Sequence, residues 1–335
     1  MDTGVKTGMA TVLREERVRA ALYRGEQLTL AIPDYLHAVR SLTDELLRQD
    51  CEAGDLTVEA VGWSSKRCTM EIRAKAEGVA AGVEEARWFY ENRGQSAKGM
   101  KRDGEAILPG DVLMRVQGDA GSLLSLERTA VNLLQRMSGI ATATRRLVQI
   151  ARAASPAAHI VATRKTPWGW LDKRAVHLGG GGTHRLSLGD AILIKTNHLS
   201  LASNELKMSF EQTLEQAWER RKGAAFFEVE VTSSAEAVTA ARVFAELQAS
   251  ADACPCLLLL DNFPAEEAKQ TVRTLRDLNL YQAAIVEASG RISEGAVAEY
   301  VAAGVDAISI GALTHSARAL DLSAKLIPRD EAAST

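Results

Sequence analysis

The chain has 335 residues, of which 46% are hydrophobic and 25% are charged, and its formal net charge is -3. A chain of this length can bury a sizeable core in one large or two ordinary domains. No apolar run approaches the roughly 20 residues that a membrane-spanning helix needs. The overall acidity argues against a nucleic-acid-binding protein, in which basic charge would form a broader patch. We therefore expect a cytoplasmic globular protein with no membrane or nucleic-acid partner, and with residues 1–29 forming a poorly ordered extension.

The first third of the chain mixes helical and extended patterns. Apolar residues recur at helical spacing over residues 35–48 and predict an amphipathic helix. Short β-like stretches follow from about Cys68, and residues 109–116 predict a turn and then a strand. Residues 122–154 are helical in pattern, and we expect Gly139, a poor helix former, to divide them into two helices. This part of the chain is therefore expected to be an α+β sandwich domain.

Beyond residue 154, short apolar strands alternate with helical stretches at the spacing of βα units. The predicted strands are 159–163, 191–195, 226–231, 256–260, 283–287 and 305–310. A further strand near His177 would make seven. The pattern predicts an α/β fold in which an incomplete barrel of six to seven strands follows the sandwich, and its main alternative is a doubly wound open sheet.

Side chains that can bind or react follow nearly every predicted strand. They are Arg164, Lys165, Lys195, Glu228, Glu230, Asp261, Glu287, Ser289, Gly290 and Gly311. In a parallel barrel the carboxyl ends of the strands converge on one face, and ligands bind there. We therefore expect these residues to form one site.

Basic residues are concentrated between residues 164 and 198, where six Lys or Arg and three His accompany only two Asp. Four consecutive glycines, Gly179 to Gly182, lie inside this stretch and could offer bare backbone N–H groups to an anion. Arg can grip a carboxylate through two parallel hydrogen bonds, and Lys supplies a compact charge. The pattern favours a pocket for a small polyanion, although solvated loop charges are the plain alternative. Of the histidines, His184 is the best ligand candidate, whereas His177 is expected to be structural.

Acidic residues on two adjacent strands complete this candidate site. Glu228 and Glu230 alternate along one strand and therefore face the same side of the sheet, and Asp261 ends the next strand. An inward carboxylate needs a metal, a base or a hydrogen-bonding ligand. Glu230 and Asp261 could bind Mg²⁺ or ribose hydroxyls, and an ion pair with Lys195 is the structural alternative. The consecutive glycine-containing turns at 287–293 and 309–315 are typical of a barrel phosphate site.

An ordered series of segments resembles the nicotinate-nucleotide pyrophosphorylase family, also called quinolinate phosphoribosyltransferase. The segments are 54–57 (GDLT), 127–142 (ERTAVNLLQRMSGIAT), 163–167 (TRKTP), 179–185 (GGGGTHR), 192–195 (ILIK), 197–198 (NH), 228–231 (EVEV), 260–262 (LDN), 287–290 (EASG) and 308–315 (ISIGALTH). The resemblance covers residues 30 to 327 and implies the reaction of quinolinate with 5-phosphoribosyl 1-diphosphate. Its products are nicotinate mononucleotide, diphosphate and CO₂, and the reaction belongs to NAD biosynthesis.

The resemblance also implies a division of the chain and a set of roles. A sandwich domain would span 30–130, a catalytic barrel 131–312, and a helix around 316–326 would pack back on the sandwich before a loose tail. The substrate contacts would be Arg128, Arg164, Lys165, His184, Arg185 and Lys195. The catalytic residues would be Lys165, Glu230 and Asp261, of which Glu230 and Asp261 would also contact Mg²⁺. The phosphate contacts would be Ser289, Gly290 and Gly311. Arg128 would come from the partner subunit of a homodimer, and assembly into a hexamer is left open.

The chain departs from the family pattern at three positions. Thr196 replaces the Asp of the usual Lys-Asp-Asn-His, Thr183 stands where many members have Asn, and Arg291 where many have Gly. Three alternatives therefore stay open. They are a paralogue of the molybdate-transport type that acts on another heteroaromatic acid, a Schiff-base lyase that uses Lys195, and a non-catalytic sensor of sugar phosphates.

Overall fold

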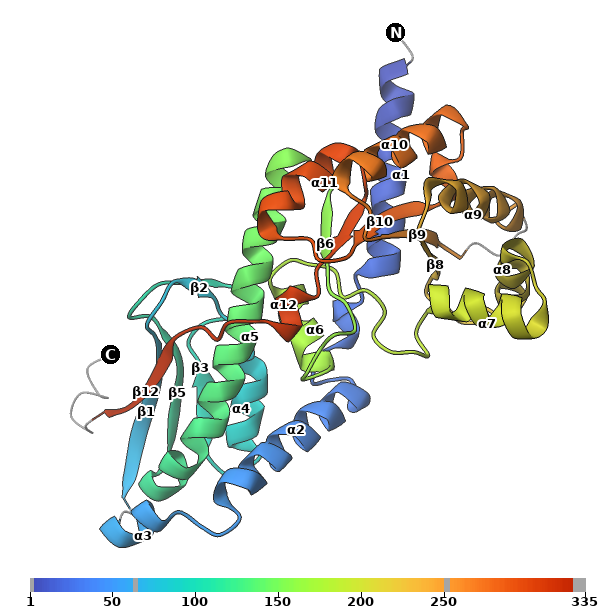
Figure 1. Ribbon diagram of the computed structural model, residues 1–335. Helices are drawn as coiled ribbons and strands as arrows, with labels where there is room; N and C mark the ends of the chain where they lie inside the picture. Colours follow the sequence, from blue (N-terminus) through green and yellow to red (C-terminus); the bar gives the residue numbers. More distant parts are fainter. Residues whose placement is uncertain (1–2, 63–65, 250–253, 328–335) are drawn as a thin grey trace. The chain divides into compact units, whose positions relative to one another are not determined.

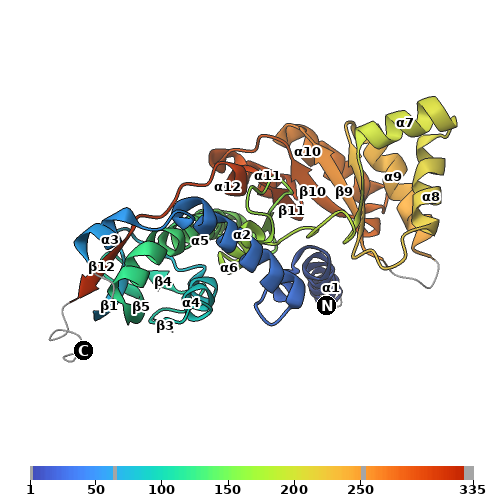
Figure 2. The ribbon, with the colours of Figure 1, turned by 90° about the horizontal axis from the view of Figure 1, so that it is seen from below.

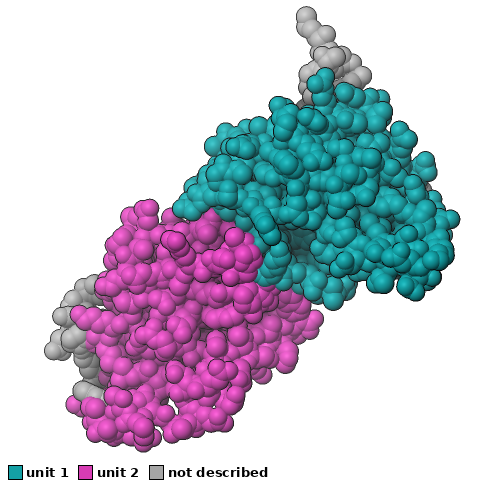
Figure 3. Space-filling model, viewed as in Figure 1, with its two compact units in different colours: residues 1–24, 146–165, 181–311 teal, residues 25–145, 166–180, 312–335 magenta. Residues whose placement is uncertain are grey.

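The computed structural model describes residues 3–62, 66–249 and 254–327. The chain forms two compact units, which are coloured separately in Figure 3. Unit 1 contains residues 1–24, 146–165 and 181–311, and unit 2 contains residues 25–145, 166–180 and 312–335. Residues 131–145 and 166–180, which we expected in the barrel, thus group with unit 2. Within the described ranges no helix is long and apolar enough to cross a membrane.

Unit 1 is built on a six-stranded sheet in which every neighbouring pair is parallel. The strands, in spatial order, are β6 (His159–Val161), β11 (Ala307–Ser309), β10 (Ile285–Ser289), β9 (Cys256–Asp261), β8 (Phe227–Val231) and β7 (Ile192–Ile194). All six strands predicted from the apolar runs are confirmed. β6 and β7 are the two ends of this order and do not pair with each other, so the sheet is an incomplete barrel.

Helices follow the strands and form an outer layer in chain order. They are α7 (Thr196–Leu206), α8 (Phe210–Glu219), α9 (Ser234–Leu247), α10 (Ala265–Asp277) and α11 (Val297–Ala303). Each helix packs against the next, and α9 also packs on β8 and β9, as Figure 2 shows. This is the arrangement of successive βα units, with buried apolar strands inside and amphipathic helices outside.

The N-terminal helix α1 (Thr3–Leu22) belongs to unit 1. Val18, Ala21 and Leu22 are buried with side chains from the beginnings of several strands, among them Leu257 and Ile285. A buried ion pair reinforces this contact, because the Arg14 guanidinium donates to both carboxylate oxygens of Asp306 at 2.7 and 2.6 Å. The expectation of a poorly ordered extension is wrong for residues 14–22. Helix α1 packs at the amino ends of the strands and leaves their carboxyl ends for a site.

Unit 2 contains a four-stranded antiparallel sheet in the order β12, β1, β5, β3. These strands are Leu322–Ile327, Arg67–Ala74, Val112–Asp119 and Ser96–Gly99, and a small pair is formed by β2 (Gly78–Val79) and β4 (Ala106–Ile107). Helix α4 (Val83–Glu91) packs on β3 and β5, and α2 (Pro33–Cys51) packs on α4. The short helix α3 (Leu56–Val61) follows α2 (Figure 1). The helix predicted over 35–48 and the strand after residue 109 are thereby confirmed.

The C-terminal segment of unit 2 corrects one prediction. We expected a helix around 316–326, but the short helix α12 (Ala312–His315) ends before this range, and residues 322–327 form strand β12. Its register along β1 runs from Leu322 opposite Ala74 to Ile327 opposite Thr69. The segment does pack back on the sandwich, but through backbone hydrogen bonds to an edge strand.

Helix α5 (Ala120–Ala154) corrects a second prediction, because it is continuous through Gly139. A Cβ atom at this position would lie 1.9 Å from the Arg318 carbonyl oxygen. Glycine at this position therefore allows another chain segment to approach the helix closely. The other residues of α5 are helix formers, and they keep the helix continuous through Gly139. The strand expected near His177 is also wrong, because residues 170–178 form helix α6 (Trp170–Leu178).

Candidate active site

A cavity of about 960 Å³ opens in unit 1 among residues at the carboxyl ends of the strands. Ten of the predicted site residues line it: Arg164, Lys165, His184, Arg185, Lys195, Glu230, Asp261, Glu287, Ser289 and Gly290. Most of them lie at the ends of separate strands, and the parallel sheet brings them together as expected. The lining also includes Thr196, Asn262 and Arg291.

The basic side of the cavity has an exposed part and a buried part. Arg164 and Lys165 follow β6 and are exposed, and the Lys165 N–H donates to Thr163 Oγ1 at 3.1 Å. Arg185 is only 6% exposed, and one of its guanidinium nitrogens donates to the Ala191 carbonyl oxygen at 3.3 Å. Burial, and then the neighbouring Arg164 charge, lower the pKa of Arg185. Such a concentration of like charge favours an anionic occupant.

Lys195 and Thr196 hold the carboxylate of Glu230 from both sides. The Lys195 ammonium donates to Oε2 at 2.7 Å, and the Thr196 hydroxyl and N–H donate to Oε1 at 2.9 and 3.2 Å. Burial alone would raise the pKa of Glu230, but these hydrogen bonds lower it below its usual value. Lys195 is also the N-cap of α7, where the His198 Nδ1 accepts its backbone N–H at 2.9 Å. His198 therefore has a structural role.

The turn after β10 is shaped for close backbone approach. Gly290 has φ +104°, and a Cβ atom there would lie 2.3 Å from Asn262 Oδ1. The Asn262 N–H donates to the Ser289 carbonyl oxygen at 2.9 Å, and its side-chain amide donates to Asp261 Oδ2 at 2.8 Å. The β9 and β10 ends are thereby fixed together, with Asp261 at the cavity.

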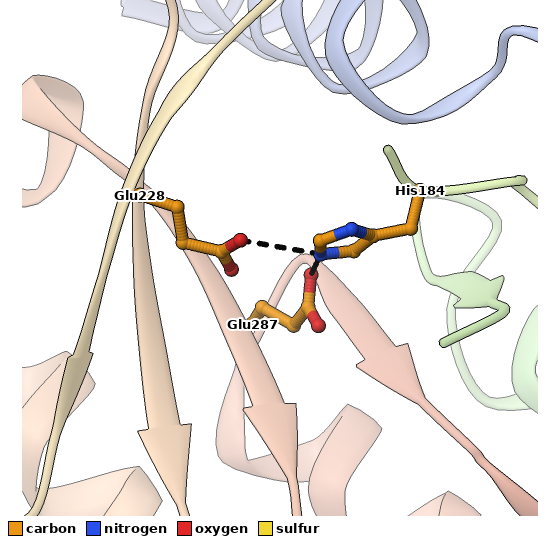
Figure 4. Close-up of side chains that lie close together, drawn as sticks. All are labelled: His184, Glu228 and Glu287. Atoms are coloured by element: carbon orange, nitrogen blue, oxygen red, sulfur yellow. Dashed lines mark ion pairs between the residues drawn. The ribbon is translucent and has the colours of Figure 1, made fainter. Parts of the chain in front are cut away.

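His184 and two acidic residues form a buried cluster beside the cavity, and Figure 4 shows both carboxylates directed at the same ring nitrogen. His184 Nε2 lies 3.2 Å from Glu228 Oε2 and 3.3 Å from Glu287 Oε2. Both glutamates are almost fully buried, at 0% and 1% exposure. Burial would lower the pKa of His184, but Glu287 and Glu228 raise it to about 9. Burial raises the pKa of Glu228.

The hydrogen bond at the other ring nitrogen indicates that the cluster binds protons more readily than a metal. The Arg185 N–H donates to His184 Nδ1 at 2.8 Å, so Nδ1 acts as an acceptor and the ring carries its proton on Nε2. The additional proton that the raised pKa values of His184 and Glu228 imply is therefore shared between Nε2 and the carboxylates. A metal-bound histidine instead uses a bare nitrogen toward the metal and donates from the other. His184 therefore donates into the carboxylate pair, although the three ligand atoms are close enough to surround an ion.

Three of the four glycines do not serve the anion-binding role that the sequence suggested, because their N–H groups are already engaged. The Gly179, Gly180 and Gly182 N–H groups donate to the carbonyl oxygens of Ala175, His177 and Ile160. At Gly182, which forms a parallel bridge with Val161, a Cβ atom would lie 2.7 Å from the Val161 side chain. Glycine at position 182 therefore allows the backbone to pack closely against Val161, just before His184 and Arg185 in the chain.

Three predicted residues are not among those that line the cavity. Glu228 of β8 is fully buried and lies against His184 instead. Gly311 follows β11 by two residues, whereas Ser309 of the same strand lines the cavity. Arg128 is on α5 in unit 2, where its side chain is 59% exposed and lies 3.7 Å from Glu127. It borders a small hollow of about 220 Å³ with Leu46, Gln49, Asp50, Thr129 and Asn132.

Three residues of the site have no specific role that the sequence predicts. The pattern places Glu228 only beside Glu230 on one face of β8, and Glu287 only at a strand end. Asn262 belongs to one of the family segments but has no predicted role. One signal in the sequence could have identified Glu228. It lies two residues before Glu230 on the same strand, and because side chains alternate along a strand, both carboxylates face the same side of the sheet.

An incomplete parallel barrel that gathers basic, acidic and glycine-turn residues at its carboxyl face is the architecture of an α/β-barrel enzyme. Family models identify which one. Residues 140–325 match the C-terminal domain of quinolinate phosphoribosyl transferase, and residues 55–138 match its N-terminal domain. The chain therefore belongs to the quinolinate phosphoribosyl transferase family.

Individual proteins agree with the family models. A probable nicotinate-nucleotide pyrophosphorylase [carboxylating] of Archaeoglobus fulgidus is 40% identical over 263 residues, covering 76% of this chain and 93% of that protein. The nicotinate-nucleotide pyrophosphorylase [carboxylating] of Homo sapiens is 33% identical over 313 residues, covering 92% and 97%. Among solved structures, NadC from Streptococcus pyogenes has a TM-score of 0.74 at 28% identity, covering 86% of this chain and 96% of that one. The nicotinate-nucleotide pyrophosphorylase from Francisella tularensis has a TM-score of 0.73 at 27% identity, covering 87% and 96%.

Proposed function

We propose that the barrel cavity of this chain converts quinolinate and 5-phosphoribosyl 1-diphosphate to nicotinate mononucleotide, diphosphate and CO₂. Family membership and the names of the relatives support this carboxylating pyrophosphorylase activity in NAD biosynthesis. The observation that carries the assignment is the meeting of four basic side chains with Glu230 and Asp261 around one cavity. A dianionic pyridine acid and a sugar phosphate need opposite charges side by side, and this cavity offers both.

The basic residues bind the two carboxylates of quinolinate. Arg164, Lys165, Arg185 and Lys195 are the candidates, with His184 beside them. Taking a dianion out of water is costly, and the cost is offset only when charge-assisted hydrogen bonds are plentiful. Buried Arg185 offers a fixed guanidinium, because one of its nitrogens already donates to the Ala191 carbonyl oxygen and its backbone N–H donates to His184 Nδ1. The exposed Arg164 and Lys165 would then close over the bound acid.

The acidic residues face the sugar. The pyridine nitrogen forms a bond to ribose C1 while the bond from C1 to diphosphate breaks, so positive charge develops on the ribose. Glu230, kept ionised by Lys195 and Thr196, can orient the ribose hydroxyls and stabilise that charge. The new cationic ring nitrogen then accepts electron density as CO₂ leaves, and the ring carbon takes up a proton. No protein nucleophile is required, so positioning dominates the rate.

Magnesium is the metal that this reaction implies. Of the two acidic residues, Asp261 is better suited than Glu230 to bind it. Asp261 lines the cavity with a carboxylate of which one oxygen accepts a hydrogen bond from Asn262. Both oxygens of Glu230 already accept hydrogen bonds, and an ion on Oε2 would lie close to the Lys195 ammonium. Mg²⁺ prefers oxygen ligands and is commonly shared with substrate phosphates. We assign Asp261 as the protein contact and Glu230 to the ribose; the metal, when bound, neutralises the departing diphosphate.

The remaining assignments concern the 5-phosphate and the partner subunit. Ser289, Gly290 and Gly311 provide the phosphate contacts, which is consistent with the tight turn at Gly290. A homodimer would supply the exposed Arg128 to a partner's cavity. The pairing of Arg128 only with Glu127 at 3.7 Å among the ion pairs of the described residues leaves its guanidinium accessible for such a role. The cytoplasmic location stays a prediction.

The test compares quinolinate with nicotinate as acceptors for phosphoribosyl diphosphate and Mg²⁺, with nicotinate mononucleotide detected by mass. Turnover of quinolinate alone supports the proposal. Turnover of another heteroaromatic acid but not quinolinate would support the paralogue, and binding of phosphoribosyl diphosphate without turnover would support the sensor. Borohydride labelling of Lys195 in the presence of a carbonyl substrate would support the lyase.

A further inference from the structure

The carboxylate of Glu230 is held by more donors than an ion pair needs. Oε2 accepts one hydrogen bond from the Lys195 ammonium at 2.7 Å, and Oε1 accepts two from Thr196, at 2.9 Å from the hydroxyl and 3.2 Å from the backbone N–H. The Glu230 side chain is only 7% exposed, whereas that of Lys195 is 46% exposed. A flexible, half-exposed ammonium is a poor positioning device by itself, because its side chain must lose rotamer freedom to hold one place.

The Thr196 contacts have the rigidity that the Lys195 contact lacks. Thr196 is the first residue of α7, so the helix fixes its backbone N–H, and its short β-branched side chain has few rotamers. Both donors reach the same oxygen, and together they determine the orientation of the carboxylate plane. The contact also requires a hydroxyl, because an ionised carboxylate at position 196 could only accept hydrogen bonds and would repel Glu230.

We propose that Thr196 is a positioning residue for the transferase reaction, whose hydroxyl fixes Glu230 toward the ribose of phosphoribosyl diphosphate. This inference rests on the proposed function of the cavity. It assigns a role to Thr196, the residue that replaces the Asp of the family pattern. In this chain the replacement changes which groups hydrogen-bond to the Glu230 carboxylate. Thr196 itself acts only through Glu230. The remaining acceptor capacity of Glu230 is left for a ribose hydroxyl.

Two variants test the hydroxyl separately from the shape of the side chain. Thr196→Val keeps the β-branched shape and the backbone N–H but removes the hydroxyl, and Thr196→Ser keeps the hydroxyl but removes the methyl group. We expect Thr196→Val to lower kcat about tenfold and to raise the KM for phosphoribosyl diphosphate, with the KM for quinolinate unchanged within about twofold. Thr196→Ser should recover kcat to within about threefold of wild type.

Thr232→Val is the matched control. Thr232 also follows a strand end and donates its hydroxyl to a glutamate, Glu236, at 3.1 Å, but it does not line the cavity. This variant should have wild-type kinetics, which separates the loss of any strand-end hydroxyl from the loss of the one at Glu230. Melting temperatures of all variants, measured alongside, separate unfolding from misplacement of Glu230.

Two outcomes would overturn the proposal. Wild-type kcat in Thr196→Val would show that the hydroxyl does not position Glu230. Equal losses in Thr196→Val and Thr196→Ser would show that Thr196 acts by something other than its hydroxyl. If the wild-type protein gives no mononucleotide, the proposed function fails instead. The same variants would then be compared by the affinity for phosphoribosyl diphosphate alone, where an unchanged affinity in Thr196→Val would still reject the positioning role.

Discussion

The Nε2 atom of His184 lies 3.2 Å from Oε2 of Glu228, in the buried interior next to the barrel cavity. Glu287 approaches the same nitrogen from another strand, at 3.3 Å. Two buried carboxylates this close to one imidazole cannot all adopt their ordinary charges without cost, and the folded cluster therefore retains a proton that the separate groups would lose.

This cluster predicts a pH dependence of stability. The pKa of His184 is raised to about 9, from an unfolded value of 6.5, by Glu287 and Glu228 against the effect of burial. A raised pKa stabilises the folded state fully below pH 6.5, and the contribution disappears as the pH rises through about 9. We expect the free energy of unfolding in urea to decrease between pH 6.5 and 9. In Glu228→Gln this decrease should be smaller, whereas the exposed Glu299→Gln should match wild type. Equal decreases in all three proteins would contradict the prediction.

The proposed binding of quinolinate by the basic side of the cavity predicts large kinetic losses when single basic residues are replaced. Arg185→Ala and Lys165→Ala should each lower kcat/KM for quinolinate by at least about 100-fold, or roughly 2.7 kcal/mol, because each removes a charged donor to a bound carboxylate. Steady-state kinetics measure this directly. Lys269→Ala, on the exposed side of α10, is the control and should have no effect. A loss under tenfold would remove the residue concerned from the set of substrate contacts.

Asp261 and Glu230 differ in how many hydrogen bonds their carboxylates already accept. We therefore predict that replacing each residue changes the Mg²⁺ dependence of the rate differently. Asp261→Asn should raise the Mg²⁺ concentration for half-maximal rate by at least about tenfold, because a neutral amide is a weaker ligand than a carboxylate. Glu230→Gln should lower kcat while leaving that concentration nearly unchanged. Titration of Mn²⁺ into each protein with phosphoribosyl diphosphate, followed by electron paramagnetic resonance, gives a readout independent of turnover. Loss of Mn²⁺ binding in Glu230→Gln would reverse our assignment.

The proposed exchange of Arg128 between subunits predicts complementation. Arg128→Ala and Lys165→Ala should each be nearly inactive, but a mixture that is unfolded and refolded together should regain activity. A hybrid dimer has one doubly damaged site and one intact site, so random pairing gives roughly a quarter of wild-type activity. A mixture no more active than its components would show that Arg128 acts within its own subunit or not at all.

Much of the barrel could be predicted from the sequence because its strands are buried on both faces. Continuous apolar runs such as Leu257 to Leu260 are the signature of parallel strands, and the strand-end residues follow from the topology. The errors concern positions where a distant segment decides the local structure. Gly139 stays helical because its missing Cβ admits the Arg318 carbonyl, and residues 322–327 are extended because β1 offers an open edge.

The site residues likewise fall into those that the sequence predicts and those that it does not. Arg164, Lys165, Arg185, Lys195, Glu230 and Asp261 were predicted, and all of them line one cavity. The Thr196 contact with Glu230 and the meeting of His184 with Glu228 and Glu287 could not be predicted. They depend on side-chain directions across neighbouring strands, and one sequence carries no information on these pairs. Three of the four N–H groups in the glycine run are not available to an anion, because they donate to carbonyl oxygens within the chain.

The most direct test of the account uses quinolinate labelled with ¹³C in the carboxylate next to the ring nitrogen. Purified protein, phosphoribosyl diphosphate and Mg²⁺ are added, and both the gas phase and the nucleotide are analysed by mass. We predict one labelled CO₂ for each nicotinate mononucleotide formed, and neither product without metal. A nucleotide that retains the label, or no nucleotide from a folded protein that binds phosphoribosyl diphosphate, would contradict the assignment of this cavity as a quinolinate phosphoribosyltransferase site.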